Sequence, residues 1–369
     1  MFHLQEVKMD LEDFIDKKIG EVRTEALDLS FGEIVNLYSE KELKIQPEYQ
    51  RLFRWSNDQR SRLIESILLE LPIPQIFVIE RENGVFELID GLQRVSSVIQ
   101  FINPDLLNLE PLTLQGCDLV KELNEKKYDD LSLRLRLTIK RSSVRTVIIK
   151  RQSKSMLRYA MFKRLNTGGE ILDPQEIRNC SARMIGEDGI RFYSFIQDKA
   201  SHSGFMNCIE TLAQVEKEKK GDEELVLRFF ATKNARSLFK GSVQDWLDNY
   251  MEKVLLNQIE FDYKKEDYEF NKLFDFLSYI LGEGAFVKYR GDKPIGGLAP
   301  AYYEAITVGT LNVIDQIHHV SRQQVKQKII DTVQTDEFRD NTGSGANKLS
   351  KLEGRIKVIQ DALLELINE

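Results

Sequence analysis

A carboxylate, a glycine, an amide and a guanidinium occur within five positions, where a strand pattern changes to a helix pattern. These residues are Asp90, Gly91, Gln93 and Arg94. The preceding residues 85–89 are mostly apolar, as in a buried strand, whereas apolar side chains recur at helical spacing afterwards. The first N–H groups of a helix lack partners and lie at the positive end of its dipole. The segment therefore predicts an anion site at a helix N-terminus.

Capping and strand signals predict the elements around this segment. Ser30 with Glu33, and Ser56 with Gln59, have the spacing of capping boxes that begin helices. Strands are expected at residues 75–79, 85–89 and 144–149. Residues 104–130 resemble a polar connector. Later helices are expected at residues 153–165, 186–199, 223–232, 243–259, 268–280, 299–317 and 322–333, and at the C-terminal end of the sequence.

The composition is that of a folded soluble protein. The chain has 369 residues, of which 42% are hydrophobic and 30% charged, so more than one domain is expected. We predict a lead-in over residues 1–26, an α+β domain over 27–180 and an all-α helical domain over 181–369.

The same composition predicts a cytoplasmic protein without a membrane partner. No apolar stretch reaches the roughly 18 residues that a membrane span needs. The N-terminus lacks a basic region followed by an apolar one, so no secretory signal is expected. Three scattered cysteines fit a reducing compartment better than a disulfide framework.

Basic residues are concentrated in one part of an acidic chain. The net charge is −7, yet residues 131–169 contain eleven basic residues and no acidic one, which leaves 41 basic against 59 acidic residues elsewhere. A local positive segment favours a phosphate-bearing partner such as DNA. The candidate DNA contacts are Arg134, Arg136, Arg141, Arg145, Lys150 and Arg151. Several of them alternate with apolar residues as on an ordinary solvated strand, and we give both interpretations equal weight.

Other chemistries find little support in the sequence. The chain has no Walker P-loop, GxGxxG or GxSxG motif. Its only adjacent histidines, His318 and His319, would point about 100° apart on a helix, and no Cys or carboxylate cluster completes a ligand set. A zinc site or an HNH-type nuclease site is therefore not expected.

Three sequence blocks, in the same order, resemble those of the GmrSD restriction endonuclease N-terminal family. The first contains Tyr49-Gln50-Arg51, Trp55 and the segment 63–74. The second, Ile89 to Arg94, is similar to the family signature Asp-Gly-Gln-Gln-Arg, with Leu92 in place of the first glutamine. The third runs from Phe162 to Gly169, and together the blocks cover roughly residues 27–180.

This resemblance implies a small mixed-sheet core related to the ParB/sulfiredoxin fold, with a nucleotide bound beside the signature. It implies a component of a bacterial anti-phage restriction system, with an NTP as substrate or effector, Mg²⁺ as cofactor and phage or modified DNA as partner. The sequence shows no C-terminal HNH-type nuclease domain. DNA cleavage is therefore expected from a nuclease partner subunit or from an unrecognised site in the first domain, and a homo-oligomer is a further expectation.

The resemblance also implies roles for individual residues. Arg94 would bind nucleotide phosphate, Gln93 would orient the attacking water, and Asp90 would bind Mg²⁺ or accept a proton. These three are the expected catalytic residues. Nucleotide contacts are expected from Tyr49, Gln50, Arg51, Gly91, Arg164, Asn166, Thr167 and Gly168.

Simpler interpretations accompany these roles. An Asp-Gly turn often only caps a helix, and Arg94 could pair with Asp90 instead of phosphate. Tyr49 and Trp55 are more often half-buried anchors than base-stacking platforms. The functional alternatives to NTP hydrolysis are a ParB-like nuclease that uses a divalent metal, and a non-catalytic DNA-binding or scaffold subunit.

Overall fold

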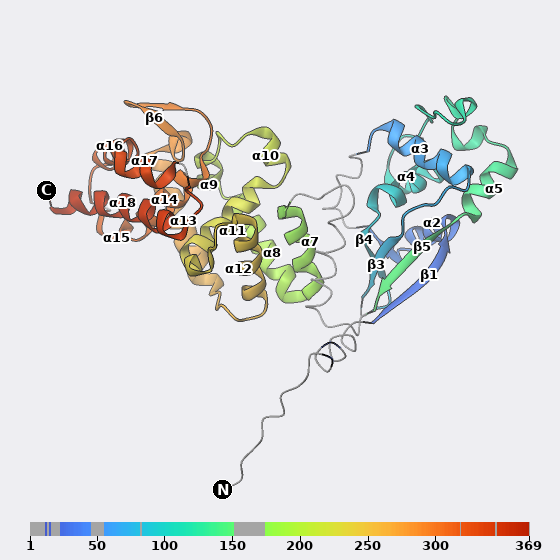
Figure 1. Ribbon diagram of the computed structural model, residues 1–369, viewed down its shortest axis with the longest axis horizontal. Coiled ribbons are helices and arrows are strands. Elements are labelled where there is room, and N and C mark those ends of the chain that lie inside the picture. The colour runs from blue at the N-terminus through green and yellow to red at the C-terminus, as the bar shows by residue number, and fades with distance from the viewer. Residues whose placement is uncertain are drawn as a thin grey trace, which may run out of the picture. The chain divides into compact units, whose positions relative to one another are not determined.

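The protein, seen in a computed structural model, divides into two compact units, Met1–Glu170 and Ile171–Glu369 (Figure 1). The structure describes residues 12, 15, 23–45, 55–81, 83–150, 174–317, 319–343 and 345–368. The expected order, an α+β domain followed by a helical domain, is confirmed. The domain limits after residues 26 and 180 stay predictions, and the predicted helix over 153–165 lies outside the described residues.

A five-stranded mixed sheet forms the centre of the first unit, in the order β1-β5-β3-β4-β2. The strands are β1 (Thr24–Ser30), β2 (Leu43–Lys44), β3 (Ile76–Glu80), β4 (Phe86–Asp90) and β5 (Ser143–Ile149). β5 is antiparallel to β1 and parallel to β3, while β4 is antiparallel to β3 and parallel to β2. Because Phe77 pairs with Asp90 and Ile76 with Thr146, the C-terminal end of β4 lies beside the N-terminal end of β3, which in turn lies beside the middle of β5.

Four helices build the core of the first unit with the sheet. They are α2 (Phe31–Ser39), α3 (Asn57–Leu68), α4 (Leu92–Ile102) and α5 (Leu133–Arg141). The Ser56 and Gln59 side chains complete the predicted capping box of α3, whereas Ser30 makes only its half of the box at α2. Phe31, Ile64 and Val95 are fully buried in the shared core.

The segment expected as a polar connector belongs to this core. It contains three short 3₁₀ turns, at Pro104–Leu107, Lys121–Leu123 and Tyr128–Asp130. Leu112, Leu114 and Cys117 are buried, so the segment packs onto the helices although its sequence has no periodic apolar pattern.

The edge strand β1 has no counterpart among the expected strands, because its largely exposed residues give little hydrophobic signal. One sequence interpretation in the first unit is wrong. The alternating residues 133–137 form part of the helix α5, capped by Ser132, and no strand surface exists there. Leu133 is 64% exposed, so this alternation does not separate a buried face from a solvated one.

The second unit is helical apart from one hairpin. Its helices are α7 (Pro174–Ile185), α8 (Glu187–Ala200), α9 (Ser203–Cys208), α10 (Gln214–Glu218), α11 (Gly221–Asn234), α12 (Val243–Leu255), α13 (Tyr263–Ile280), α14 (Pro300–Leu311), α15 (Ile314–Ile317), α16 (Arg322–Thr332), α17 (Asp336–Thr342) and α18 (Leu349–Asn368). Two 3₁₀ turns, Arg236–Leu238 and Gly282–Gly284, and the hairpin strands β6 (Lys288–Arg290) and β7 (Lys293–Ile295) complete it.

Aromatic packing and one close helix contact hold this unit together. Phe229, Phe230 and Phe270 are fully buried, and their rings lie edge-on or stacked against one another. Gly309 lets α14 lie against α18, because a Cβ there would come within 2.9 Å of Ile359. Among the described residues, no helix is long and apolar enough to cross a membrane.

Candidate functional site

Gly91 forms the turn between β4 and α4. Its φ of +97° lies in the left-handed region that favours glycine. A Cβ at this position would lie 2.4 Å from Cγ2 of Ile76, the first residue of β3. Glycine therefore permits both the backbone conformation and the close packing of α4 onto the start of β3.

The Arg94 guanidinium spans this turn. Its Nη2 donates to Asp90 Oδ2 at 2.9 Å and to the carbonyl oxygen of Gln75 at 3.0 Å. The two side chains are partly accessible, at 17% for Arg94 and 35% for Asp90. The simpler interpretation, an ion pair within the turn, thus describes this geometry. Arg94 Nε is buried without a partner among the described residues, so one charge-bearing donor is left unsatisfied.

Gln93 connects the turn to the start of α3. Its Oε1 accepts the backbone N–H of Trp55 at 3.4 Å. The Trp55 carbonyl accepts Arg60 Nε at 3.1 Å, and Arg60 Nη1 donates to Gln100 Oε1 at 3.0 Å. Burial lowers the pKa of Arg60. These hydrogen bonds therefore place Trp55 of the first sequence block directly beside the signature.

The start of α4 is suited to a bound anion. This eleven-residue helix has neither a side-chain cap nor an acidic residue in its first turn, so its first N–H groups and its dipole are uncompensated by its own side chains. Among the described residues, no group of three or more His, Cys, Asp or Glu side chains is arranged to hold a metal. Mg²⁺ binding through Asp90 therefore stays a prediction and needs oxygen ligands from elsewhere, such as nucleotide phosphates.

Several predicted contacts cannot be compared with this geometry. The residues that lie outside the described part of the chain are Tyr49, Gln50, Arg51, Arg151, Arg164, Asn166, Thr167 and Gly168. Their roles stay predictions.

Three of the predicted DNA contacts pair with nearby groups of the first unit. Arg145 on β5 lies 3.5 Å from Asp28 on β1. Lys150 lies 2.5 Å from Glu25, and the hydrogen bond between these side chains raises the pKa of Lys150. Arg136 lies 3.8 Å from Asp129 and 5.9 Å from the ring centre of Tyr128. Each of these three cations therefore already has a neighbouring side chain of the protein as a partner.

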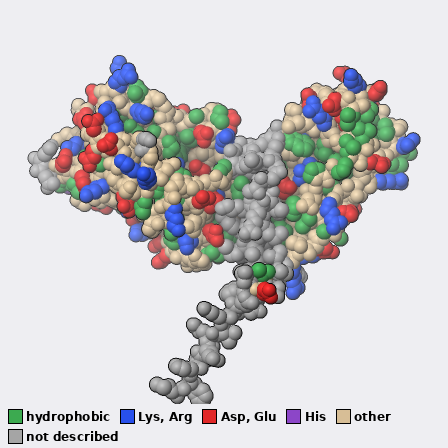
Figure 2. Space-filling view, in the orientation of Figure 1, with side chains coloured by type: hydrophobic (Ala, Val, Ile, Leu, Met, Phe, Trp, Pro, Cys, Tyr) green, Lys and Arg blue, Asp and Glu red, His purple; other side chains and the backbone are tan. Residues whose placement is uncertain are grey.

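Arg134 and Arg141, in contrast, line one open groove of about 750 Å³. The groove lies between the end of α3, the following loop, α5 and the start of β5, and its lining residues are Ile67, Glu70, Leu71, Ile73, Leu133, Arg134, Leu137, Thr138, Arg141, Ser142 and Ser143. Hydrophobic side chains are visible on this face of the first unit (Figure 2). The groove contains Ser143, which begins β5, whereas Asp90 lies level with Val147 through Phe77, so the groove is displaced along the strands from the Asp90 turn.

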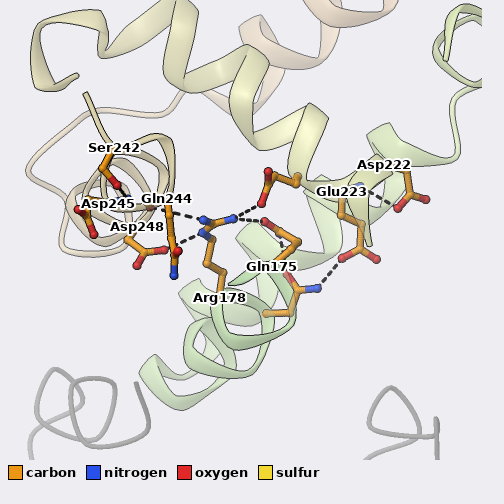
Figure 3. Close-up of polar contacts among 10 residues, drawn as sticks. Gln175, Arg178, Asp222, Glu223, Ser242, Gln244, Asp245 and Asp248 are labelled. Carbon is orange, nitrogen blue, oxygen red and sulfur yellow. Dashed lines mark hydrogen bonds and ion pairs between the residues drawn. The ribbon is translucent and has the colours of Figure 1, made fainter. Parts of the chain in front are cut away.

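The helical unit contains a buried polar cluster that the sequence did not suggest (Figure 3). Arg178 on α7 is 1% exposed and donates to Asp248 at 2.7 Å, to Glu224 at 2.8 Å and to Gln175 at 2.9 Å. Its remaining nitrogen is 3.4 Å from the carbonyl oxygen of Gln244. Each guanidinium nitrogen thus has at least one acceptor, and the cluster joins α7, α11 and α12. The residues come from three separated helices, so no local motif reveals them.

The first unit is thus a mixed-sheet domain with an Asp/Arg pair at a glycine turn and an uncapped helix N-terminus. Residues 32–182 match a family model described as the GmrSD restriction endonuclease N-terminal domain. The predicted resemblance to this family is therefore confirmed over the matched residues. The matched segment includes both the Asp90 turn and Arg178.

Comparisons with curated proteins and with solved structures found no match. The relation of the sheet to the ParB/sulfiredoxin fold accordingly stays a prediction. The predicted absence of an HNH-type nuclease domain stays a prediction as well.

Proposed function

We propose that this chain is the nucleotide-binding, NTP-hydrolysing component of an anti-phage DNA restriction system. The family match supports the restriction system. The observation that carries the nucleotide site is the uncapped N-terminus of α4, with Arg94 in its first turn and Asp90 directly before it. Mg²⁺ and an NTP are the proposed cofactor and substrate.

The turn offers three chemical contributions to phosphoryl transfer. Arg94 and the first N–H groups of α4 stabilise the negative charge on the phosphate oxygens. Asp90 binds the metal ion or accepts the proton of the attacking water. Gln93, which directly precedes Arg94 in the sequence, orients that water. In this role its side chain gives up the hydrogen bond to the Trp55 N–H and binds the water instead.

Phosphate binding at Arg94 competes with the Asp90 carboxylate. The guanidinium nitrogen Nη2 already donates to Asp90 and to the Gln75 carbonyl. The buried Nε has no described partner and provides a second donor. Asp90 would hold a metal ion through its carboxylate, and its attraction for Arg94 would then be weaker, which would leave the guanidinium available to phosphate.

The test is phosphate release from ATP, GTP, CTP and UTP with Mg²⁺, measured on the full chain. We expect Asp90→Asn and Arg94→Ala each to reduce release by roughly 100-fold or more, because each removes charge stabilisation or proton transfer. The matched control is Glu25→Gln, which removes a carboxylate paired with Lys150 on the edge strand β1, separated from β4 by β5 and β3. Unchanged release in both site variants would remove the proposed site, and absence of nucleotide binding would remove the function.

DNA cleavage is proposed to come from a partner subunit. A non-catalytic DNA-binding subunit is the second candidate, favoured by Arg134 and Arg141, which line the groove without an ion-pair partner among the described residues. It predicts salt-dependent DNA binding by the wild-type chain with no release of phosphate from any NTP.

A further inference from the structure

The hairpin β6–β7 is a short two-stranded ribbon at the margin of the helical unit (Figure 1). It lies outside the family match, which ends at residue 182. Lys288 pairs with Ile295, Tyr289 with Pro294, and Arg290 with Lys293. Figure 2 shows Lys and Arg side chains at the margin of the unit where Figure 1 labels β6.

The two faces of the ribbon differ in character because strand side chains alternate between faces. Tyr289 is 9% exposed, and its hydroxyl donates to the carbonyl oxygen of Gly284 at 2.8 Å. This face anchors the ribbon to the unit. The other face carries the exposed cations Lys288, Arg290 and Lys293.

The tip of the ribbon is held in place by α16 and by Gln334, which follows the C-terminal end of that helix. The Gly291 N–H donates to Gln334 Oε1 at 3.0 Å, and Gln334 Nε2 donates to the Gly291 carbonyl at 3.1 Å. Gln327 of α16 donates to Asp292 at 3.0 Å. Asp292, the only acidic residue of the ribbon, therefore accepts a hydrogen bond from a side-chain amide. Together these hydrogen bonds hold the backbone that carries the cationic face.

The arrangement of these cations destabilises the ribbon. Arg290 and Lys293 occupy directly opposite positions, where like charges destabilise a strand pair. Within the described part of the chain, no carboxylate forms an ion pair with Lys288, Arg290 or Lys293. An external polyanion would relieve this repulsion, which the protein itself leaves uncompensated.

We propose that the cationic face of the β6–β7 ribbon binds duplex DNA. The major groove of B-DNA admits a two-stranded β-ribbon. The two strands of such a ribbon lie about 5 Å apart, so the ribbon is narrower than the roughly 12 Å width of that groove. Lysine and arginine at its edges then contact the flanking phosphates, which fixes orientation without reading sequence. The inference rests on the proposed function only in naming DNA as the partner.

The experiment measures binding of the full chain to a fluorescently labelled 24-base-pair duplex, without NTP, at several salt concentrations. The test variant carries Lys288→Gln, Arg290→Gln and Lys293→Gln. We expect the slope of log affinity against log salt concentration to decrease in magnitude by about 2 to 3, since each phosphate contact contributes about 0.9. Affinity at low salt should fall at least tenfold.

A matched control separates this surface from net charge. Lys240→Gln, Lys265→Gln and Lys357→Gln remove three exposed lysines of the same unit and change the net charge equally, so they should leave the slope unchanged. Lys293→Glu provides a second variant that places opposite charges across the ribbon. It should preserve the thermal midpoint and weaken DNA binding more than Lys293→Gln.

Equal slopes for the ribbon variant and the lysine control would overturn the proposal, as would binding to phosphatidylserine vesicles but not to duplex. This outcome is distinct from failure of the proposed nucleotide site, which shows as unchanged phosphate release in Asp90→Asn and Arg94→Ala. The ribbon variant should retain the wild-type rate of NTP hydrolysis without DNA, because the ribbon lies outside the domain that carries Asp90.

Discussion

Gly91 illustrates how single residues position the candidate site. The sequence shows a glycine after a strand, and its permissive backbone follows from residue type alone. The structure adds a steric reason, because the space that a Cβ would need is filled by Ile76. That residue is distant in sequence from Gly91, so the contact depends on the pairing of β3 with β4.

Gly91→Ala should therefore destabilise the first unit more than another glycine substitution at positive φ. Gly84 has a φ of +80°, but a Cβ added there would have no atom within 4 Å, so Gly84→Ala should cost about 1–2 kcal/mol from backbone strain. Gly91→Ala adds overpacking of about 1–3 kcal/mol. Urea unfolding of both variants checks the difference. Equal free energies of unfolding for Gly91→Ala and Gly84→Ala would show that the Ile76 side chain moves aside without loss of stability.

Local spacing predicts some residue contacts and misses others for a physical reason. Asp90 and Arg94 are four residues apart across a turn, so their proximity follows from the sequence. The ion pair between Arg145 and Asp28 depends on the register of β1 against β5. β1 gives little hydrophobic signal, so its pairing with β5 is not predicted from the sequence. The ion pair of Arg145 therefore cannot be predicted from residue types either.

At the scale of elements, the segment between α4 and α5 shows how a polar sequence becomes part of a core. Glu65 of α3 is buried, and its Oε1 accepts the backbone N–H groups of Leu119 at 3.0 Å and Val120 at 2.6 Å. The helix thus supplies the hydrogen bonds that a loop normally obtains from water. Sequence periodicity detects repeated apolar faces, and a loop held by one buried carboxylate has none.

The Cys117 thiol makes the stability of this segment dependent on pH. Burial, with smaller contributions from the Glu65 and Asp118 carboxylates, raises the pKa of Cys117 to about 11. Between pH 9 and 11 the unfolded chain has lost this proton while the folded protein retains it, so the free energy of unfolding falls as the pH rises. The loss should approach 2 kcal/mol, on the order expected for a shift of about two units.

The measurement is urea unfolding at pH 8, 9, 10 and 11, followed by Trp55 emission in a Trp246→Phe background. Cys117→Ala removes the titrating thiol, so its stability should depend less steeply on pH than that of the parent. A constant difference between the two proteins at every pH would contradict the raised pKa.

At the scale of the whole molecule, each unit has its own hydrophobic core and its own tryptophan. Trp55 lies in the first unit and Trp246 in the helical unit, and these are the only two in the chain. The order of an α+β and a helical domain follows from sequence patterns, because strand and helix signals separate along the chain. The family match nevertheless extends into the helical unit, where Arg178 lies. The sequence alone does not show that Arg178 belongs to the helical unit, because this depends on its partners Glu224 on α11 and Asp248 on α12.

Arg178→Leu should weaken the helical unit and leave the first unit unaffected. Removing the guanidinium leaves Asp248 and Glu224 without their buried counter-ion. Loss of one partner of a buried pair costs about 3–5 kcal/mol, and the 31% exposure of Glu224 reduces that figure to about 2–4 kcal/mol. Arg339→Leu is the matched control, because Arg339 pairs with Asp336 on the exposed surface and should cost less than about 1 kcal/mol.

The two tryptophans report these effects separately. In a Trp55→Phe background, urea unfolding followed by Trp246 emission should shift to lower urea in Arg178→Leu and scarcely shift in Arg339→Leu. In a Trp246→Phe background, Trp55 emission should show the same midpoint with and without Arg178→Leu. Equal shifts at both tryptophans would mean that the units unfold together. A Trp246 transition unchanged by Arg178→Leu would mean that the buried cluster contributes no net stability, because the free energy of burying its charges then equals that of their attraction.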